Sequence, residues 1–324
     1  MAGHGESKMA VIAAVVANLA IAIIKFIAAA ITGSSAMISE GIHSLVDTGN
    51  GGLLLFGMKR AAIPADEGHP FGHGKALYFW SLVVAVSIFG IGGGMSLYEG
   101  VAHIRHVAPE AVHADPTANY IVLAIALVVE GFSFSVAIRE FWRAKGSRGP
   151  WQFIKESKDP SLYTVVLEDS AAMLGLVFAF LGVFFGHLFE NPYLDGIASI
   201  AIGLLLMGVA FILAFETKGL LLGEGADAAT IDELRAIVEA DPAVDRAGDI
   251  LTMYMGPHDL LVNLGVSFKK GTRAEAMHEA IARIEDAITG AHPECVRVYI
   301  EAESLPAEPA APASAEPAAE PTGA

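Results

Sequence analysis

Residues Leu194–Phe215 read LDGIASIAIGLLLMGVAFILAF, with Asp195 as the one charged side chain. A helix of about 20 apolar residues crosses the hydrocarbon core of a bilayer. This stretch is therefore predicted to be a transmembrane helix, in which Asp195 lies at the interface or caps a helix end. Five further stretches meet the same criterion: Met9–Thr32, Ala36–Met58, Leu77–His103, Tyr120–Phe141 and Tyr163–Leu188. The predicted fold class is a membrane α-helical domain with six transmembrane helices.

The composition of the whole chain also indicates a membrane protein. Of its 324 residues, 54% are hydrophobic and 17% are charged, and the mean hydropathy is +0.52. Soluble domains carry about 25% charged residues, so an ordinary soluble enzyme is disfavoured. The net charge of −16 argues against nucleic acid as a partner. Cys295 is the one cysteine in the sequence, which excludes an internal disulfide framework and a zinc site built from cysteines.

Basic residues gather on one side of the predicted spans. They are Lys8, Lys59, Arg60, Lys75, Arg139, Arg143, Lys145, Arg148, Lys155 and Lys158. The opposite side offers essentially Arg105 alone. Loops rich in lysine and arginine stay on the cytoplasmic side of a membrane. We therefore expect an integral membrane protein of a bacterial inner membrane, with both termini in the cytoplasm.

The region after the last span has the pattern of a small soluble domain. Apolar residues recur at helical spacing in 231–238 and 277–288, and they alternate in 260–268 and 296–300. With a further strand at Ile250–Met255, the order helix–strand–strand–helix–strand predicts an α+β domain with an acidic surface. The predicted domains are residues 1–225 (transmembrane), 226–303 (cytoplasmic) and 304–324 (a disordered Ala/Pro/Glu tail).

The second and fifth predicted spans each carry a pair of neighbouring ionisable residues, and such residues are costly in a membrane and are functional candidates by default. His43 and Asp47 stand four residues apart in the second span, on one face of a helix. Glu168 and Asp169 lie a few residues inside the fifth span, and either or both can supply an oxygen ligand. Imidazole and carboxylate are ligands of tetrahedral zinc sites. The alternatives are a polar pair that holds helices together and two solvated acids at the interface.

Glu130 stands near the middle of the fourth span, with no basic residue close to it in the sequence. A buried carboxyl in this position either carries a proton or pairs with a cation from another helix. Lys25 of the first span is the candidate partner, and the sequence leaves both alternatives open.

A third candidate group lies in the loop after the second span, where residues 66–75 read DEGHPFGHGK. Asp66, His69 and His73 together offer a carboxylate and two imidazoles for a divalent cation at the membrane surface. The alternative is a loop that is polar only because water surrounds it.

The sequence resembles the cation diffusion facilitator family of divalent-metal/proton antiporters. The resemblance rests on SEGIHSLVD at residues 39–47 and HPFGHGK at residues 69–75, together with the six spans and the acidic αββαβ domain. It implies a homodimeric exporter with a ferredoxin-like cytoplasmic domain. It also implies that the transported cation lies between the second and fifth spans, and that the three loop residues match a second site found in some members.

The resemblance further implies roles for individual residues in the spans. His43 and Asp47 match the ligand pair of the second span. The histidine usual in the fifth span is Val165 here, and the Leu-Glu-Asp motif at residues 167–169 is instead similar to a subgroup that includes a mitochondrial zinc transporter. The fourth ligand and the metal preference are therefore left open.

The favoured interpretation is a secondary transporter that exports a divalent cation from the cytoplasm in exchange for protons, by alternating access. Protons compete with the cation because ligation requires neutral imidazole and ionised carboxylate. Zinc is the first expectation, and manganese, iron(II), cobalt and cadmium stay open because the site is rich in oxygen ligands. The expected partners are this cation, protons, the lipid membrane and a second copy, with no further cofactor. The alternatives are a membrane metal sensor and, less favoured, an intramembrane metalloenzyme.

Overall fold

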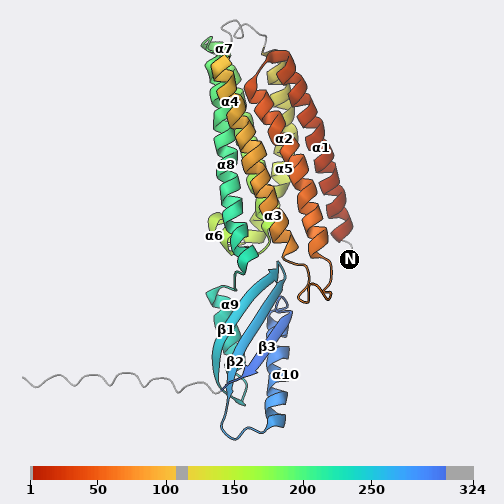
Figure 1. Cartoon of the computed structure of the whole chain (residues 1–324), viewed down its shortest axis with the longest axis vertical. Helices are drawn as coiled ribbons and strands as arrows, with labels where there is room; N and C mark the ends of the chain where they lie inside the picture. The colour runs from red at the N-terminus through yellow and green to blue at the C-terminus, as the bar shows by residue number, and fades with distance from the viewer. Residues whose placement is uncertain (1–2, 107–115, 304–324) are drawn as a thin grey trace, which may run out of the picture. The chain divides into compact units, whose positions relative to one another are not determined.

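The computed structural model describes residues 3–106 and 116–303, so the predicted tail at residues 304–324 lies outside the described residues. Figure 1 shows long helices lying side by side in a bundle. They are α1 (Gly3–Thr32), α2 (Ser35–Ala61), α3 (Ala76–Ser87), α4 (Gly94–His106), α5 (Thr117–Lys145), α7 (Pro160–Leu188) and α8 (Tyr193–Leu222). A π-helical segment, η1 (Ile88–Gly93), joins α3 to α4, and a short helix, α6 (Pro150–Glu156), precedes α7.

Four helices are long and apolar enough to cross a membrane, and they make the chain an integral membrane protein. Within the described ranges they are Ala76–His106, Thr117–Lys145, Pro160–Leu188 and Tyr193–Leu222. α1 contributes a shorter apolar run, Asn18–Thr32. α2 has the length of a span, but it buries polar residues, among them Glu40, His43 and Asn50, which lower its hydropathy. The crossing of the membrane by α1 and α2 stays a prediction.

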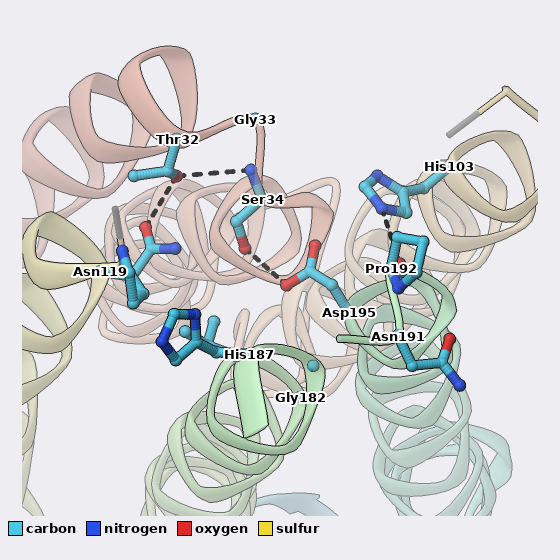
Figure 2. A pocket seen from close by; sticks show the side chains of 13 residues that line it. Thr32, Gly33, Ser34, His103, Asn119, Gly182, His187, Asn191, Pro192 and Asp195 are labelled. Atoms are coloured by element: carbon cyan, nitrogen blue, oxygen red, sulfur yellow. Dashed lines mark hydrogen bonds between the residues drawn. The ribbon is translucent and has the colours of Figure 1, made fainter. Parts of the chain in front are cut away.

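The turn between α1 and α2 is fastened to the start of α8. Gly33 takes a left-handed conformation (φ 71°), which glycine adopts without strain. Ser34 then caps α2, because its hydroxyl oxygen accepts a hydrogen bond from the Met37 N–H at 3.2 Å. Asp195 of α8 accepts a hydrogen bond from Ser34 Oγ at 2.7 Å (Figure 2). It also accepts one from the Ala36 N–H at 3.2 Å. Asp195 therefore does cap a helix, and that helix is α2.

Glycines let α4 and α8 approach closely. A Cβ atom at Gly100 would lie 2.6 Å from the carbonyl oxygen of Gly196, and one at Gly203 would lie 2.8 Å from the Leu97 nitrogen. Both distances are too short for a side chain. Small residues in membrane helices serve such close packing, so these glycines set the spacing of the two helices.

The C-terminal unit is a three-stranded sheet with two helices. Its elements are α9 (Ala228–Glu239), β1 (Val244–Gly256), β2 (Asp259–Phe268), α10 (Ala274–Ala291) and β3 (Arg297–Ala302). This is the predicted order of helices and strands. The sheet order is β1-β2-β3, and β2 pairs in parallel with β3 so that Leu261 lies opposite Arg297. The core of the unit includes Leu234, Val238, Val262, Leu264, Ile284 and Ile288. The exact limits of the predicted domains stay a prediction.

Candidate metal and proton site

His43 and Asp47 form a pair on the buried face of α2. His43 Nδ1 lies 3.4 Å from Asp47 Oδ1, and the two side chains are 3% and 15% exposed. Within the described part of the chain, His43 Nε2 and Asp47 Oδ1 are buried without a hydrogen-bond partner. Buried polar atoms in proteins nearly always have such a partner. An imidazole nitrogen and a carboxylate oxygen are thus left available to a ligand.

Glu168 and Asp169 approach this pair from α7. Glu168 Oε1 accepts a hydrogen bond from Asn50 Nδ2 of α2 at 2.8 Å. Asp169 Oδ2 accepts one from Ser133 Oγ of α5 at 3.2 Å. Both carboxylates lie within electrostatic range of Asp47. The predicted ligands of α2 and α7 therefore share one neighbourhood.

In the structure, the ligand atoms of these four residues do not all lie close enough together to surround one cation. Among the described residues, the group of metal-binding side chains whose ligand atoms all lie within 4.8 Å of one another is instead Asp66, His69 and His73. The helices α2 and α7 would have to bring their carboxylates closer to surround a cation.

Lys25 is the centre of a second buried group. Its ammonium lies 2.8 Å from Glu40 Oε2 and 2.8 Å from Glu130 Oε1, and it donates a hydrogen bond to Ser44 Oγ at 2.9 Å. Lys25 and Glu40 are fully buried and the Glu130 side chain is 10% exposed. Glu130 was predicted either to carry a proton or to pair with Lys25, and the structure shows the pair with Lys25. We call Lys25, Glu40 and Glu130 the buried triad.

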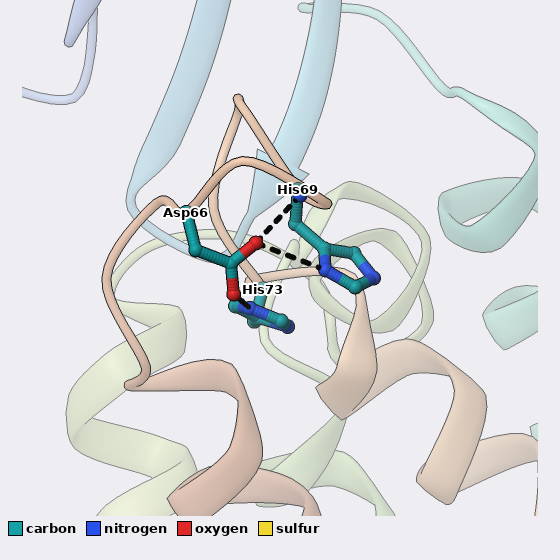
Figure 3. A group of neighbouring side chains, drawn as sticks. All are labelled: Asp66, His69 and His73. Atoms are coloured by element: carbon teal, nitrogen blue, oxygen red, sulfur yellow. Dashed lines mark hydrogen bonds and ion pairs between the residues drawn. The ribbon is translucent and has the colours of Figure 1, made fainter.

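The loop residues Asp66, His69 and His73 lie together at the surface (Figure 3). Asp66 Oδ1 accepts a hydrogen bond from the His69 N–H at 2.7 Å, and Asp66 Oδ2 lies 2.9 Å from His73 Nε2. The hydrogen bonds from His73 and from the His69 backbone lower the pKa of Asp66 to about 2. Asp66 is thus ionised through the acid range in which an ordinary aspartate titrates, and it is ready to bind a cation.

A polar pocket opens where the α1–α2 turn meets the ends of α7 and α8 (Figure 2). His103, His187 and Asp195 line it. Asp195 is engaged in capping α2, and His103 Nε2 lies 3.3 Å from the carbonyl oxygen of Pro192. None of the residues predicted as metal ligands lines this pocket, so it adds nothing to the candidate site.

A family model described as the cation efflux transmembrane domain matches residues 11–222. The chain belongs to the cation efflux family, the cation diffusion facilitators. The match covers both helices that carry the candidate ligands. The members of this family are transporters. The family match therefore disfavours the alternative of an intramembrane metalloenzyme.

Curated relatives of this cation diffusion facilitator carry names that concern zinc and magnetosomes. It is 35% identical over 246 residues to the proton-coupled zinc antiporter SLC30A9, mitochondrial, of Xenopus laevis, across 75% of this chain and 44% of the relative. It is 36% identical over 234 residues to the human protein of that name, across 72% and 41%. It is 25% identical over 290 residues to magnetosome protein MamM of Paramagnetospirillum magneticum, across 89% and 85%. The chain thus spans less than half the length of the zinc antiporters.

The expected compartment is not supported by these relatives. The zinc antiporters that this cation diffusion facilitator matches are named mitochondrial, whereas the positive loops predicted a bacterial inner membrane. Loop charges report which side of a membrane a loop occupies and carry no information on which membrane it is. The other part of the prediction, that the chain is an integral membrane protein, is confirmed.

Four residues of this cation diffusion facilitator's site were not predicted. They are Glu40, Ser44, Asn50 and Ser133, which hold the predicted residues by hydrogen bonds or ion pairs. Helical spacing carried a signal for two of them, because Glu40 precedes His43 by three residues and Asn50 follows Asp47 by three. Ser133 gave no such signal, since its contact with Asp169 joins two helices.

Proposed function

We propose that this chain exports a divalent cation, zinc first, from the cytoplasm in exchange for protons. His43, Asp47, Asp169 and Glu168 are the proposed ligands. The observation that carries the proposal is the pair of buried atoms without a hydrogen-bond partner, His43 Nε2 and Asp47 Oδ1. Two relatives named proton-coupled zinc antiporters support the choice of zinc and of protons.

The chemistry of these side chains links the cation to protons. A cation binds to neutral imidazole and ionised carboxylate, and each of these groups can bind a proton in its place. A site that faces the two sides of the membrane in turn would therefore release its cation where protons are abundant. We propose alternating access by a change in the packing of α2 against α7, which would also complete the coordination shell.

The proposed assembly follows the sequence analysis. It is a homodimer in which α1 and α2 join the four apolar helices as spans, both termini are cytoplasmic and the C-terminal unit is ferredoxin-like. The basic residues that flank the spans support the orientation. The helix–strand–strand–helix–strand order with a parallel β2–β3 pair supports the C-terminal fold.

Zinc uptake into sealed proteoliposomes tests the transport activity. With the vesicle interior more acidic than the outside, the full chain is expected to concentrate zinc inside, and collapse of the pH gradient should stop uptake. Zinc binding without any flux would favour the metal sensor over the transporter. Competition by manganese, iron(II), cobalt and cadmium in the same vesicles ranks the cations.

The pH dependence of zinc affinity follows from the ligand chemistry. Because imidazole and carboxylate bind the metal only after they lose their protons, apparent affinity should fall steadily between about pH 8 and about pH 5.5. Equilibrium zinc binding to the detergent-solubilised chain measures this directly. An affinity that stays constant across this range would mean that protons do not compete at the proposed ligands.

The loop group is proposed as a separate and weaker cation site. The Asp66 and His69 side chains are exposed and that of His73 is partly exposed, so the loss of ligands there leaves no fully buried charge. The double variant His69→Ala/His73→Ala should lose one bound zinc per chain and keep transport, with at most a several-fold change in rate or apparent affinity. Metal content and vesicle flux, measured on the same preparation, check this. Complete loss of flux with the other zinc still bound would contradict the separation of the two sites.

A further inference from the structure

The buried triad leaves a negative charge that no described partner balances. One ammonium, that of Lys25, faces two carboxylates at 2.8 Å each. With both carboxylates ionised, the formal charge of the three groups is −1. A buried charge without a partner is costly, and a carboxyl relieves that cost by binding a proton.

Each carboxylate also has an oxygen that is buried without a hydrogen-bond partner. These atoms are Glu40 Oε1 and Glu130 Oε2. Lys25 and Ser44 are the groups that contact the other oxygens, at distances up to 3.5 Å. A carboxylate oxygen without a donor is a position where a proton can be held.

The backbone of α7 makes room for one of these oxygens. A Cβ atom at Gly175 would overlap Glu40 Oε1, so a side chain at this position of α7 would displace the Glu40 carboxylate. The packing of α7 against α2 thus leaves space for Glu40 Oε1, the oxygen without a hydrogen-bond partner.

Ionisable groups of two helices lie within electrostatic range of the triad. α2 contributes His43 and Asp47, and α7 contributes Asp169, with Glu168 next to it in the sequence. Lys25 acts electrostatically on His43 and Asp47, and Glu130 acts on Asp47 and Asp169. The charge of the triad therefore acts on the proposed cation site, although no direct hydrogen bond between the described residues of the two groups joins them.

We propose that Glu40 and Glu130 together hold one proton beside Lys25, and that this proton leaves to water when a cation binds near His43 and Asp47. The second half rests on the proposed function. Before binding, one carboxyl is neutral and the triad carries no net charge. A divalent cation nearby favours the ionised form, so the O–H bond breaks, the proton goes to water and the triad becomes −1. Return of a proton to the triad then weakens the hold on the cation.

The proton is tested without any metal. Infrared difference spectra of the full chain between acid and alkaline pH detect the C=O stretch of a protonated carboxyl. Glu40→Gln and Glu130→Gln each leave one carboxylate paired with Lys25, a neutral pair with no need of a proton. Both variants should therefore lose the same band, and both should fold. Glu140→Gln, an exposed acid on α5, is the matched control and should keep it. A band that persists in both triad variants would overturn the proposal.

Zinc binding tests the release of the proton. In a weakly buffered solution, the wild-type chain and Glu140→Gln should release about one more proton per bound zinc than Glu40→Gln or Glu130→Gln. Equal proton release by all four proteins would overturn the coupling to the cation. Failure of zinc flux in vesicles would count against the proposed function alone, because the infrared measurement requires no metal.

Discussion

Asp47→Ala is expected to reduce zinc flux to the level of protein-free vesicles while the chain stays folded. Asp47 contributes a carboxylate oxygen that is buried without a hydrogen-bond partner, beside His43. Without it, α2 offers one imidazole, which is too few ligands to replace the water around a divalent cation. The variant also removes a carboxylate that lies near three others, so no buried cation is left without its partner.

The control for this variant is Asp232→Ala, the same substitution at an exposed position of α9. It should transport zinc at the wild-type rate. Both proteins are compared at equal amounts in the vesicle membrane, with size-exclusion profiles to show that each is folded. Flux near the wild-type rate from Asp47→Ala would refute the assignment of the cation site to α2.

The sequence was sufficient for the parts of the fold that depend on local pattern. Apolar length predicted the long helices, and alternation predicted β2 and β3 within a few residues. The short helix α6 was not predicted, because seven residues contain too few turns for periodicity to show. The π-helical segment at Ile88–Gly93 was not predicted either, because its six residues carry no polar side chain that would mark a change in helical period.

Contacts between distant residues lay beyond sequence reasoning. Lys25 and Glu130 are 105 residues apart, and the sequence offered their pairing only as one of two alternatives. Asp195 was predicted to cap a helix end, yet nothing in its neighbourhood indicated that the helix would be α2. In contrast, His43 with Asp47 and Asp66 with His69 lie within one helical turn or one loop, so their spacing predicted their proximity.

Lys25→Met is expected to have the largest effect on stability. It removes the ammonium that both triad carboxylates contact at 2.8 Å. Removal of one partner from a buried ion pair costs about 3–5 kcal/mol, because a charge is left buried without compensation. Glu40 and Glu130 must then stay ionised without a partner or bind protons. The loss of stability should therefore be greatest at alkaline pH and smaller at acid pH.

A triple variant separates the lost charge from the lost side chain. In Lys25→Met/Glu40→Gln/Glu130→Gln the shapes of the side chains are nearly kept and no charge is buried, so most of the stability should return. Thermal unfolding of the detergent-solubilised full chain, at about pH 8 and about pH 5.5, measures both variants against the wild type. If Lys25→Met unfolds at the wild-type temperature at both pH values, the ammonium does not hold these helices together. If the triple variant is as unstable as the single one, the methionine side chain disrupts the packing, and the ion pairs contribute little to the stability of the bundle.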